Sequence, residues 1–476
     1  MTQTDPTIQH NNEPLSNQVR AETNQVEPKC LRTFTPTQAV IAKGAGSFLW
    51  TADGRRLVDF TSGVLVANLG HNPCAWTKRF IDLMGWRDFA QIPQGAGCQA
   101  TCRSSCDGAF PATPMTAYNA ITPVEVAAST MLRQFCSGRP GGKRLEQVLW
   151  AASGSEGVVK AIWAALARDK SRDMILATRH GFHGKKGLAG AVTGSEKDKE
   201  RDPRVRFISF PMEECRDISL RNKTFNPALY QKELEDLWQQ HGGKLTALIT
   251  EPYLGGGGSY HPPAAYLQML QEFCRQKDIV FILDEVQSNF GRTGDLFAFE
   301  TYGLEPDLVV LGKGLGNGMP VAAVVGRCDL LGAMDYGEGS DTWSANPLAS
   351  AAVVATLEAF AGGGPVPRMK KSSAVIEAGL LALQSDLPFV SNVRGENGGM
   401  VWGIEMQEYK GKSAKDWANQ FVLECYRGED HEGIHLLGPL AQKVVRISPP
   451  LVISEEEAAA SMALMLRVGK RMASLA

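Results

Sequence analysis

The chain of 476 residues is long enough for two or three domains and a large core. Hydrophobic residues make up 43% and charged residues 21% of it, which is typical of soluble globular proteins. The 49 Lys and Arg nearly balance the 51 Asp and Glu, which disfavours a nucleic-acid binder and a polybasic membrane-surface protein. No apolar run approaches the roughly 20 residues that a bilayer span needs.

The N-terminal residues and the cysteines indicate the compartment. Residues 1–34 are polar and lack the apolar core of a secretory signal, so we expect a disordered tail. The ten cysteines are mostly scattered singly, which favours a reducing cytoplasm. One cluster, Cys98, Cys102 and Cys106, lacks the C-x2-C spacing of zinc sites. We expect free thiols in a loop there, rather than a metal site or a disulfide.

Short apolar runs alternate with helical stretches over residues 76–345, the expected large domain. The runs are rich in Val, Ile, Leu or Phe and end at polar or Gly residues, as strands buried on both faces do. Segments with helical periodicity, such as Gly157–Arg168 and Ala265–Lys277, lie between several of them. This alternation predicts an α/β fold with a mostly parallel sheet. The predicted strands are Gln147–Ala151, Met174–Thr178, Arg206–Phe210, Leu245–Thr250, Ile279–Leu283, Leu308–Leu311 and Ala322–Gly326.

Residues 346–476 predict a smaller α+β domain. Residues 35–75 contain a hairpin-like alternation that turns at Asp53-Gly54, and we expect this segment to join the smaller domain. The elements expected in the smaller domain are a long helix, two strands and a final helix: Asn346–Phe360, Met400–Glu405, Val444–Ile447 and the residues from Ser454.

Ligands of open parallel sheets bind beyond the carboxyl ends of the strands. After the first predicted strand, Ser153-Gly154-Ser155 opens a helix whose free N–H groups suit a phosphate, although the same motif is an ordinary helix cap. Asp284 and Glu285 follow the strand Ile279–Leu283. Because an unpaired buried carboxylate is costly, such a group is functional, caps a helix or forms a structural salt bridge.

Lys313 stands between two glycines directly after the strand Leu308–Leu311. Glycines let the backbone turn sharply and admit a bulky group near the ammonium. The pattern is not a P-loop. A lysine whose pKa is depressed by burial can form a Schiff base, and an exposed loop lysine is the alternative. A phosphate cradle, a buried carboxylate and a Gly-flanked lysine at three strand ends are together what pyridoxal 5'-phosphate (PLP) needs.

The stretches around these motifs resemble the class III PLP-dependent aminotransferases, the family of ornithine, acetylornithine, 4-aminobutyrate and ω-amino-acid transaminases. The resemblance runs from about Gly46 to the C-terminus. It implies the fold of a fold-type I PLP-dependent transferase and a homodimer with shared active sites. The similar stretches are GSFLWTADGRRLVDFTSGVLVANLGHNP at 46–73, SGSE at 153–156, GFHG at 181–184, EP at 251–252, FILDEVQSNFGRTG at 281–294, LGKGLGNGMPVAAVVG at 311–326, TWSANPLA at 342–349 and VRISPPL at 445–451.

The resemblance also implies the site residues. Lys313 would carry the cofactor as a Schiff base and move the substrate proton, and Asp284 would pair with the pyridinium nitrogen. Arg446 would bind a substrate carboxylate, which suits its two parallel donors. The other implied cofactor contacts are Gly154 and Ser155 at the phosphate, Thr342 at the phosphate of the partner subunit, Phe182 on the ring face with His183 beside it, Val286, Gln287 near the phenolic oxygen, and Glu251 supporting the pocket.

Position 256 departs from part of the family. The ornithine and 4-aminobutyrate branches carry a Glu five residues after the Glu of the Glu-Pro pair, where it masks the substrate-binding arginine. Here that residue is Gly256, so we expect Arg446 to stay unmasked in both half-reactions. This weakens the ornithine and 4-aminobutyrate assignments. It favours donors whose carboxylate reaches Arg446, such as α-amino acids or other ω-amino acids.

The predicted reaction moves an amino group from an ω-amino acid or simple amino acid to a 2-oxo acid, through the pyridoxamine form of the cofactor. A racemase or epimerase on the same scaffold is the first alternative, because it also needs Lys313 and Asp284. An aminomutase is disfavoured by Gln287. A cofactor-binding scaffold without activity is disfavoured by the intact Lys313, Asp284 and Thr342. We expect small-molecule substrates and no nucleic-acid or membrane partner.

Overall fold

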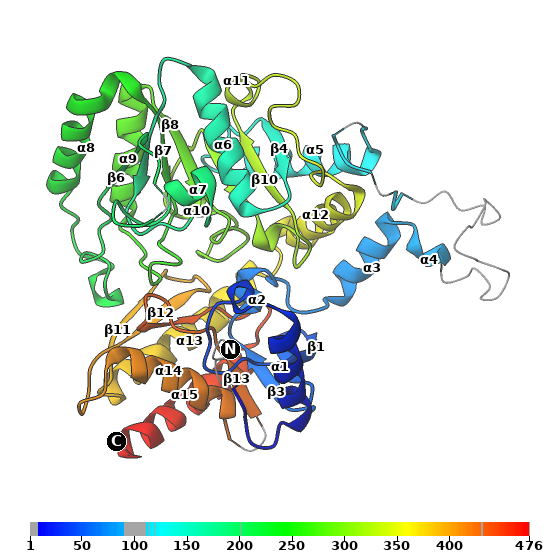
Figure 1. The fold of residues 1–476 in the computed structure, drawn as a ribbon, viewed down its shortest axis with the longest axis vertical. Coiled ribbons are helices and arrows are strands. Elements are labelled where there is room, and N and C mark those ends of the chain that lie inside the picture. The colour runs from blue at the N-terminus through cyan, green and yellow to red at the C-terminus, as the bar shows by residue number, and fades with distance from the viewer. Residues whose placement is uncertain are drawn as a thin grey trace.

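The structure is a computed structural model that describes residues 8–89, 111–113, 115–118, 120–199, 201–429 and 432–475. The cluster of Cys98, Cys102 and Cys106 lies outside the described residues. The described chain contains a seven-stranded, a four-stranded and a three-stranded sheet. In Figure 1 the seven-stranded sheet and its helices occupy the upper half of the view, and the two smaller sheets lie below it.

The seven-stranded sheet has the order β4-β10-β9-β8-β7-β5-β6. Strands β5 to β9 are parallel to one another, and β10 is antiparallel to both of its neighbours. The mostly parallel α/β sheet predicted from the sequence is therefore confirmed, with small differences at strand ends. The strands are β4 Gln147–Ala151, β5 Met174–Thr178, β6 Val205–Ile208, β7 Leu245–Thr250, β8 Val280–Asp284, β9 Leu308–Leu311 and β10 Ala322–Gly326.

Helices cover both faces of this sheet. Alternate residues of β5 enter two separate apolar clusters. Leu176 belongs to one cluster, and Ile175 and Ala177 belong to the other. This double burial explains why the strands are continuous apolar runs. The helices that follow or flank the strands are α5 Pro123–Ser137, α6 Gly154–Arg168, α7 Gly187–Ala191, α8 Ala228–His241, α9 Ala264–Lys277, α10 Ala298–Thr301 and α11 Cys328–Leu331, with the short 3-10 turns η2 Ile218–Leu220, η3 Gly242–Lys244 and η4 Lys313–Leu315.

The smaller sheets combine the two ends of the chain. The predicted hairpin is present and turns at Asp53-Gly54, and its second strand β3 pairs in parallel with β13. The three-stranded sheet is antiparallel. Helices α13, α14 and α15 pack on these strands and on one another. The elements are β1 Ile41–Ala45, β2 Phe48–Thr51, β3 Arg56–Asp59, α2 Ser62–Leu65, α13 Val366–Asp386, β11 Val390–Gly395, β12 Trp402–Met406, α14 Ala414–Arg427, β13 Glu432–His435, β14 Val444–Ile447 and α15 Glu455–Leu475.

The disordered tail predicted for residues 1–34 is wrong over its middle. Residues Pro14–Val26 form α1, which lies against the smaller sheets in Figure 1, and Lys29–Leu31 form the turn η1. Glu13 accepts hydrogen bonds from Arg20 at 2.7 Å and from the Tyr426 hydroxyl at 2.9 Å. Glu13 also pairs with Arg55 at 2.8 Å, so a polar helix is held by an ion pair and a hydrogen bond to residues that are distant in sequence.

Helix α12 (Pro347–Phe360) also lies elsewhere than expected. We assigned it to the smaller domain, but it packs against α5 and α3 (Cys74–Leu83), beside the seven-stranded sheet. The helix is apolar on nearly all sides, which suits this buried position. The short helix α4 spans Trp86–Phe89. Among the described residues no single helix is long and apolar enough to cross a membrane; only α12 and α13 together meet that length and composition, and they are bent by 77°.

Candidate active site

The loops after four parallel strands meet at one edge of the seven-stranded sheet. Because parallel strands end at the same edge, the residues after β5, β7, β8 and β9 lie close together. The electrostatic neighbours of Lys313 include Asp284, Glu251 and Arg446. The fold therefore places four predicted site residues in one cluster, although they come from distant parts of the sequence.

Asp284 is the last residue of β8 and is almost fully buried. Its Oδ2 atom lies 2.7 Å from Nδ1 of His183, and its Oδ1 atom accepts a hydrogen bond from the Val286 amide at 3.0 Å. The His183 amide in turn donates to the Thr193 hydroxyl at 2.8 Å. This carboxylate is thus fixed in position by the loop that follows β5.

Glu285, the neighbouring carboxylate, has a structural function instead. Its side chain accepts hydrogen bonds from the Ala298 and Phe299 amides at 2.7 and 2.8 Å, at the start of α10. Burial raises the pKa of Glu285 to about 8. The helix-cap interpretation therefore holds for Glu285, whereas Asp284 faces the cluster around Lys313.

Lys313 follows β9 and has a left-handed backbone conformation with φ of 45°. Its surroundings are crowded, since a side chain at Gly314 would place its Cβ 2.6 Å from the Asn68 amide nitrogen. Burial lowers the pKa of Lys313 to about 8, while the nearby Asp284 and Glu251 carboxylates oppose this shift. A lysine with this pKa has an appreciable neutral fraction near neutral pH, and the neutral amine is the nucleophile that forms a Schiff base.

The predicted phosphate cradle lies at the first turn of α6. Ser153 caps the helix by accepting a hydrogen bond from the Glu156 amide, so the amides of Gly154 and Ser155 remain at the open helix end. A Cβ at Gly154 would lie 3.0 Å from Val286. Gly154 therefore packs against the residue that follows the Asp284-Glu285 pair, and the exposed Ser155 lies next to it.

Glu251 connects the two loops on the other side of the cluster. It accepts hydrogen bonds from the Phe182 amide at 2.9 Å and from the Gly255 amide at 3.4 Å. Burial raises the pKa of Glu251 to about 7. The Phe182 side chain is 45% exposed, so the ring is not part of the apolar core. Glu251 thus fixes the backbone that carries this exposed ring.

Arg446 lies on β14 and is 3% exposed. Its Nη2 atom donates to the Gly255 carbonyl at 2.8 Å, and its Nε atom is buried without a hydrogen-bond partner. Burial lowers the pKa of Arg446. No carboxylate of the described chain pairs with this guanidinium. Arg446 is therefore a buried residue, and it has donors available for an anion.

Thr342 lies on a turn that precedes the buried helix α12. Its side chain is exposed. Its neighbour Trp343 is 69% exposed, and Asp341 anchors the turn to α6 through Lys160. The structure gives no contact between Thr342 and the cluster around Lys313. The predicted position of Thr342 in the site of a partner subunit stays a prediction.

The described residues fit PLP in four respects. Nε2 of His183 and Oε1 of Gln287 are buried without hydrogen-bond partners, which leaves polar capacity for a ligand. The α6 amides suit its phosphate, the exposed face of Phe182 suits its ring, and Lys313 suits its aldehyde. Gln287 lies tightly against Gly255, because a Cβ there would be 1.7 Å from Oε1 of Gln287.

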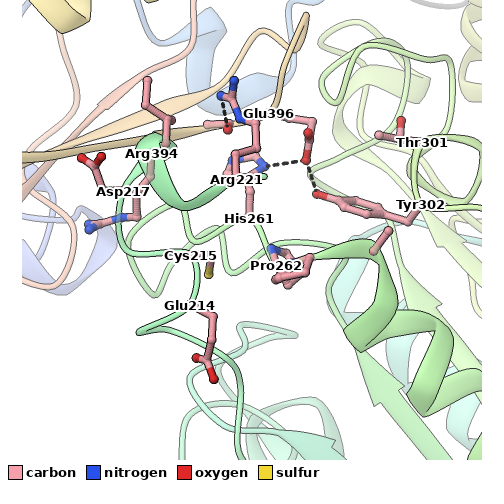
Figure 2. A pocket seen from close by; sticks show the side chains of 14 residues that line it. Glu214, Cys215, Asp217, Arg221, His261, Pro262, Thr301, Tyr302, Arg394 and Glu396 are labelled. Carbon is pink, nitrogen blue, oxygen red and sulfur yellow. Dashed lines mark hydrogen bonds and ion pairs between the residues drawn. The ribbon is translucent and has the colours of Figure 1, made fainter. Parts of the chain in front are cut away.

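A separate pocket lies between loops of the seven-stranded sheet and strand β11 (Figure 2). None of the predicted site residues lines it within the described chain. His261 stacks on Tyr253 there, and burial lowers its pKa to about 3. Glu396 accepts a hydrogen bond from Tyr302 at 2.9 Å. These residues lie where the two parts of the molecule meet.

The sequence reasoning missed two residues that organise the site. The Thr193 hydroxyl accepts hydrogen bonds from the His183 and Gly184 amides, and a lone threonine gives no signal in the sequence. Lys160 is buried on α6 and binds Asp341. This lysine interrupts the apolar run of α6, which is a signal that could have drawn attention to it.

The chain matches the model of the class-III aminotransferases over residues 113–468. It is 28% identical to the acetylornithine aminotransferase of Oceanobacillus iheyensis over 92% of this chain and 94% of that protein. It is 30% identical to the 4-aminobutyrate aminotransferase of Mycobacterium bovis over 87% of each chain.

Solved structures show the same fold. The ornithine aminotransferase of Toxoplasma gondii superposes with a TM-score of 0.75, at 21% identity, over 97% of this chain and 96% of that chain. A PLP-bound amine transaminase from an uncultivated Pseudomonas species also gives 0.75, at 23% identity, over 94% and 97%. The fold predicted from the resemblance, that of fold-type I PLP-dependent transferases, is thereby confirmed. The chain belongs to the class-III aminotransferase family and is a PLP-dependent aminotransferase.

Proposed function

We propose that this aminotransferase uses donors whose carboxylate binds Arg446, namely simple α-amino acids or ω-amino acids, with a 2-oxo acid as acceptor. The observation that carries the proposal is the buried Arg446 guanidinium, which donates to the Gly255 carbonyl and has an unpartnered Nε atom. A buried arginine without a paired carboxylate is costly unless an anion completes its hydrogen bonds. A bidentate carboxylate supplies two parallel acceptors.

The glycine run supports this choice of substrate. Residue 256 has no carboxylate to place beside Arg446, and a Cβ at this position would lie 3.2 Å from Cβ of Phe182. Arg446 donates a hydrogen bond to the carbonyl of Gly255 rather than to an acidic side chain. A carbonyl bond is weaker than an ion pair, so an incoming carboxylate displaces it more readily than it would displace a glutamate. Arg446 can thus bind the carboxylate of the amino donor and that of the 2-oxo acid acceptor.

The residues around Lys313 carry the chemistry in this proposal. Bound PLP supplies an electron sink for the charge left on the substrate carbon. Lys313 Nζ, with its pKa near 8, would accept the proton from that carbon and pass it to the cofactor carbon that takes up the amino group. Asp284, held by His183, keeps a pyridine N–H in place, while Phe182, Val286 and Gln287 pack around the ring. Gly154 and Ser155 hold the phosphate. Glu251 supports the backbone of Phe182.

A homodimer completes the proposed site through Thr342. The turn that carries Thr342 bears large exposed aromatic side chains, Trp343 at 69% and the nearby Tyr336 at full exposure. Exposed aromatic residues of this kind are enriched at protein interfaces. A second copy of the chain would cover them and bring Thr342 to its cofactor phosphate. We also place the enzyme in the cytoplasm, in keeping with seven free cysteines among the described residues.

Arg446 variants test the substrate class. We expect Arg446→Met to raise KM for β-alanine and for an α-amino acid by about 100-fold, because the variant loses a charge-assisted contact. Propylamine, which has no carboxylate, serves as the matched donor, and its kcat/KM is expected to stay unchanged. Arg446→Lys keeps the charge but loses the two parallel N–H donors, so its KM for these donors is expected to lie between those of the wild type and Arg446→Met. Equal losses for propylamine and the amino acids would contradict the proposal.

The first half-reaction with a single donor distinguishes transamination from racemisation on this scaffold. We expect each productive donor to yield its oxo product in an amount stoichiometric with the bound cofactor. Substrate deuterium exchange without any oxo product would instead indicate the racemase alternative.

A further inference from the structure

Lys160 is a buried cation in the helix that forms the phosphate cradle. It lies on the second turn of α6, after Gly154 and Ser155, and is 3% exposed. Its Nζ atom donates to the Trp150 carbonyl at 2.6 Å and to Oδ2 of Asp341 at 2.5 Å. Trp150 belongs to β4, the strand that leads into the cradle. The lysine thus joins β4 and α6 to a residue that is 181 positions away.

Asp341 uses the remaining capacity of its carboxylate to shape the turn that follows it. Its Oδ1 atom accepts hydrogen bonds from the Trp343 and Ser344 amides, both at 2.8 Å, and the Ser344 hydroxyl donates to Oδ2. Burial acts to raise the pKa of Asp341, but the hydrogen bonds from Lys160, Ser344 and the two amides lower it to about 2. The group is therefore a carboxylate at any physiological pH, and its bonds enclose Thr342.

The far end of the same turn is fixed to α12. Asn346 donates from Nδ2 to the Trp343 carbonyl at 2.7 Å and accepts from the Ala349 amide at 2.9 Å, which caps the helix. Ala345 has a left-handed backbone with φ of 58°. The exposed Thr342 thus projects from a turn that is held at both ends by buried or half-buried groups.

We propose that Lys160 and Asp341 are positioning residues that hold Thr342 for the cofactor phosphate of the partner subunit. The proposal rests on the function proposed above, in which Thr342 reaches across the dimer. It adds a link between the two sites: the same helix α6 begins with the cradle of its own site and, one turn later, anchors the turn that serves the other site. Neither residue touches the cofactor, and both act through the backbone around Thr342.

Cofactor affinity tests the positioning function directly. Lys160→Met and Asp341→Asn are expected to raise the dissociation constant for PLP about tenfold, because a misplaced Thr342 loses a phosphate contact. Pyridoxal lacks the phosphate, so its affinity is expected to stay that of the wild type. Lys170→Met, which removes an exposed lysine just beyond α6, is the control. Ser344→Ala, a smaller change in the same network, provides a second variant where Lys160→Met does not fold.

Heterodimers show in which site Lys160 acts. In the first, Lys160→Met is placed on a chain that also carries Lys313→Ala, paired with a wild-type chain. The only cofactor-binding lysine is then served by the altered turn, and we expect weak PLP binding. In the second, Lys160→Met is on the chain that keeps Lys313, and the Lys313→Ala partner supplies a native turn. We expect wild-type affinity there.

The visible absorption band of lysine-bound cofactor, titrated with PLP, is the readout in both heterodimers. The reverse order of affinities, or equal affinities, would overturn the proposal, because Lys160 would then act on its own cradle or on neither site. Loss of pyridoxal and PLP affinity together would overturn it as well. Absence of the band from the wild-type enzyme would instead mean that the proposed function itself has failed.

Discussion

Nδ1 of His183 lies 2.7 Å from Oδ2 of Asp284, and both side chains are almost fully buried. The histidine belongs to the loop after β5, and the aspartate ends β8, two strands away in the sheet. His183 thus contacts one oxygen of the Asp284 carboxylate, and the Val286 amide donates a hydrogen bond to the other, Oδ1. Asp284 is therefore oriented before any ligand binds.

Replacement of His183 by Phe is expected to lower the rate of the first half-reaction about tenfold, because Asp284 loses one hydrogen bond and its fixed orientation. Replacement of Asp284 by Asn removes the charge itself and is expected to lower the rate by about 10²- to 10³-fold. Rapid-mixing absorbance measurements with a saturating donor compare the two. A larger effect of His183→Phe than of Asp284→Asn would contradict the assigned hierarchy.

The lowered pKa of Lys313 predicts how cofactor loading depends on pH. Since the neutral amine attacks the aldehyde, the rate at which apoenzyme takes up PLP is expected to rise with pH and level off above about pH 8. An ordinary lysine would show a continued rise to about pH 10.4. Stopped-flow absorbance from pH 6 to 10 measures this profile. A rate that still climbs between pH 9 and 10 would show that the site does not depress the pKa.

A glutamate introduced at position 256 is expected to mask Arg446. Gly256→Glu supplies the carboxylate that the glycine run lacks, so KM for carboxylate-bearing donors is expected to rise about tenfold. Gly256→Gln has nearly the same shape without the charge and controls for crowding against Phe182, which a Cβ would contact at 3.2 Å. Steady-state kinetics on β-alanine compare the two variants. Equal KM values would mean that position 256 does not reach the arginine.

Docking of α1 depends on Arg20 and Glu13, which pair with each other at 2.7 Å and bind the rest of the chain through the Gln38 carbonyl and Arg55. Arg20→Met leaves the Glu13 carboxylate with fewer donors and is expected to cost about 3 kcal/mol in the free energy of docking. The exposed pair of Arg32 and Glu27 is the control, and Arg32→Met is expected to cost less than about 1 kcal/mol. Hydrogen exchange over residues 14–26 reports both. Unchanged protection in Arg20→Met would show that the pair does not hold the helix.

Acid is expected to release the same helix. Burial acts to raise the pKa of Glu13, but hydrogen bonds from Arg20 and Tyr426 lower it below its ordinary value of 4.5. A carboxyl whose pKa is depressed by folding stabilises the folded state above its unfolded pKa, and this contribution is lost as the pH falls through the folded pKa. Proteolysis near residue 27 is therefore expected to increase below pH 4.5 in the wild type, and Glu13→Gln is expected to be susceptible already at pH 7.

The sequence predicted the seven central strands because each is a short apolar run between polar residues, and such runs have few alternatives when both faces are buried. It did not predict α1, whose partners Arg55 and Tyr426 lie far away in the chain. It also placed α12 in the wrong part of the molecule. An apolar helix shows that it is buried, but the pattern does not show which surface covers it.

In the candidate site, too, some features were predicted from the sequence and others needed the structure. Strand ends at one edge of a parallel sheet predicted that the residues around Asp284 and Lys313 would meet, and they do. The division of labour between Asp284 and Glu285 needed the structure, because only the hydrogen bonds to α10 show that Glu285 is a cap. The absence of an acid at position 256 was visible in the sequence. The carbonyl of Gly255 that takes its place at Arg446 was not.

The most direct test of the account is the visible spectrum of the purified PLP-loaded enzyme, before and after a single amino donor is added without any oxo acid. We expect the band of the lysine-bound cofactor to disappear with a carboxylate-bearing donor and to return when a 2-oxo acid is added. The Lys313→Ala variant is expected to lack the band. A band that persists with every donor would contradict transamination, and a wild type without the band would contradict the assignment of Lys313.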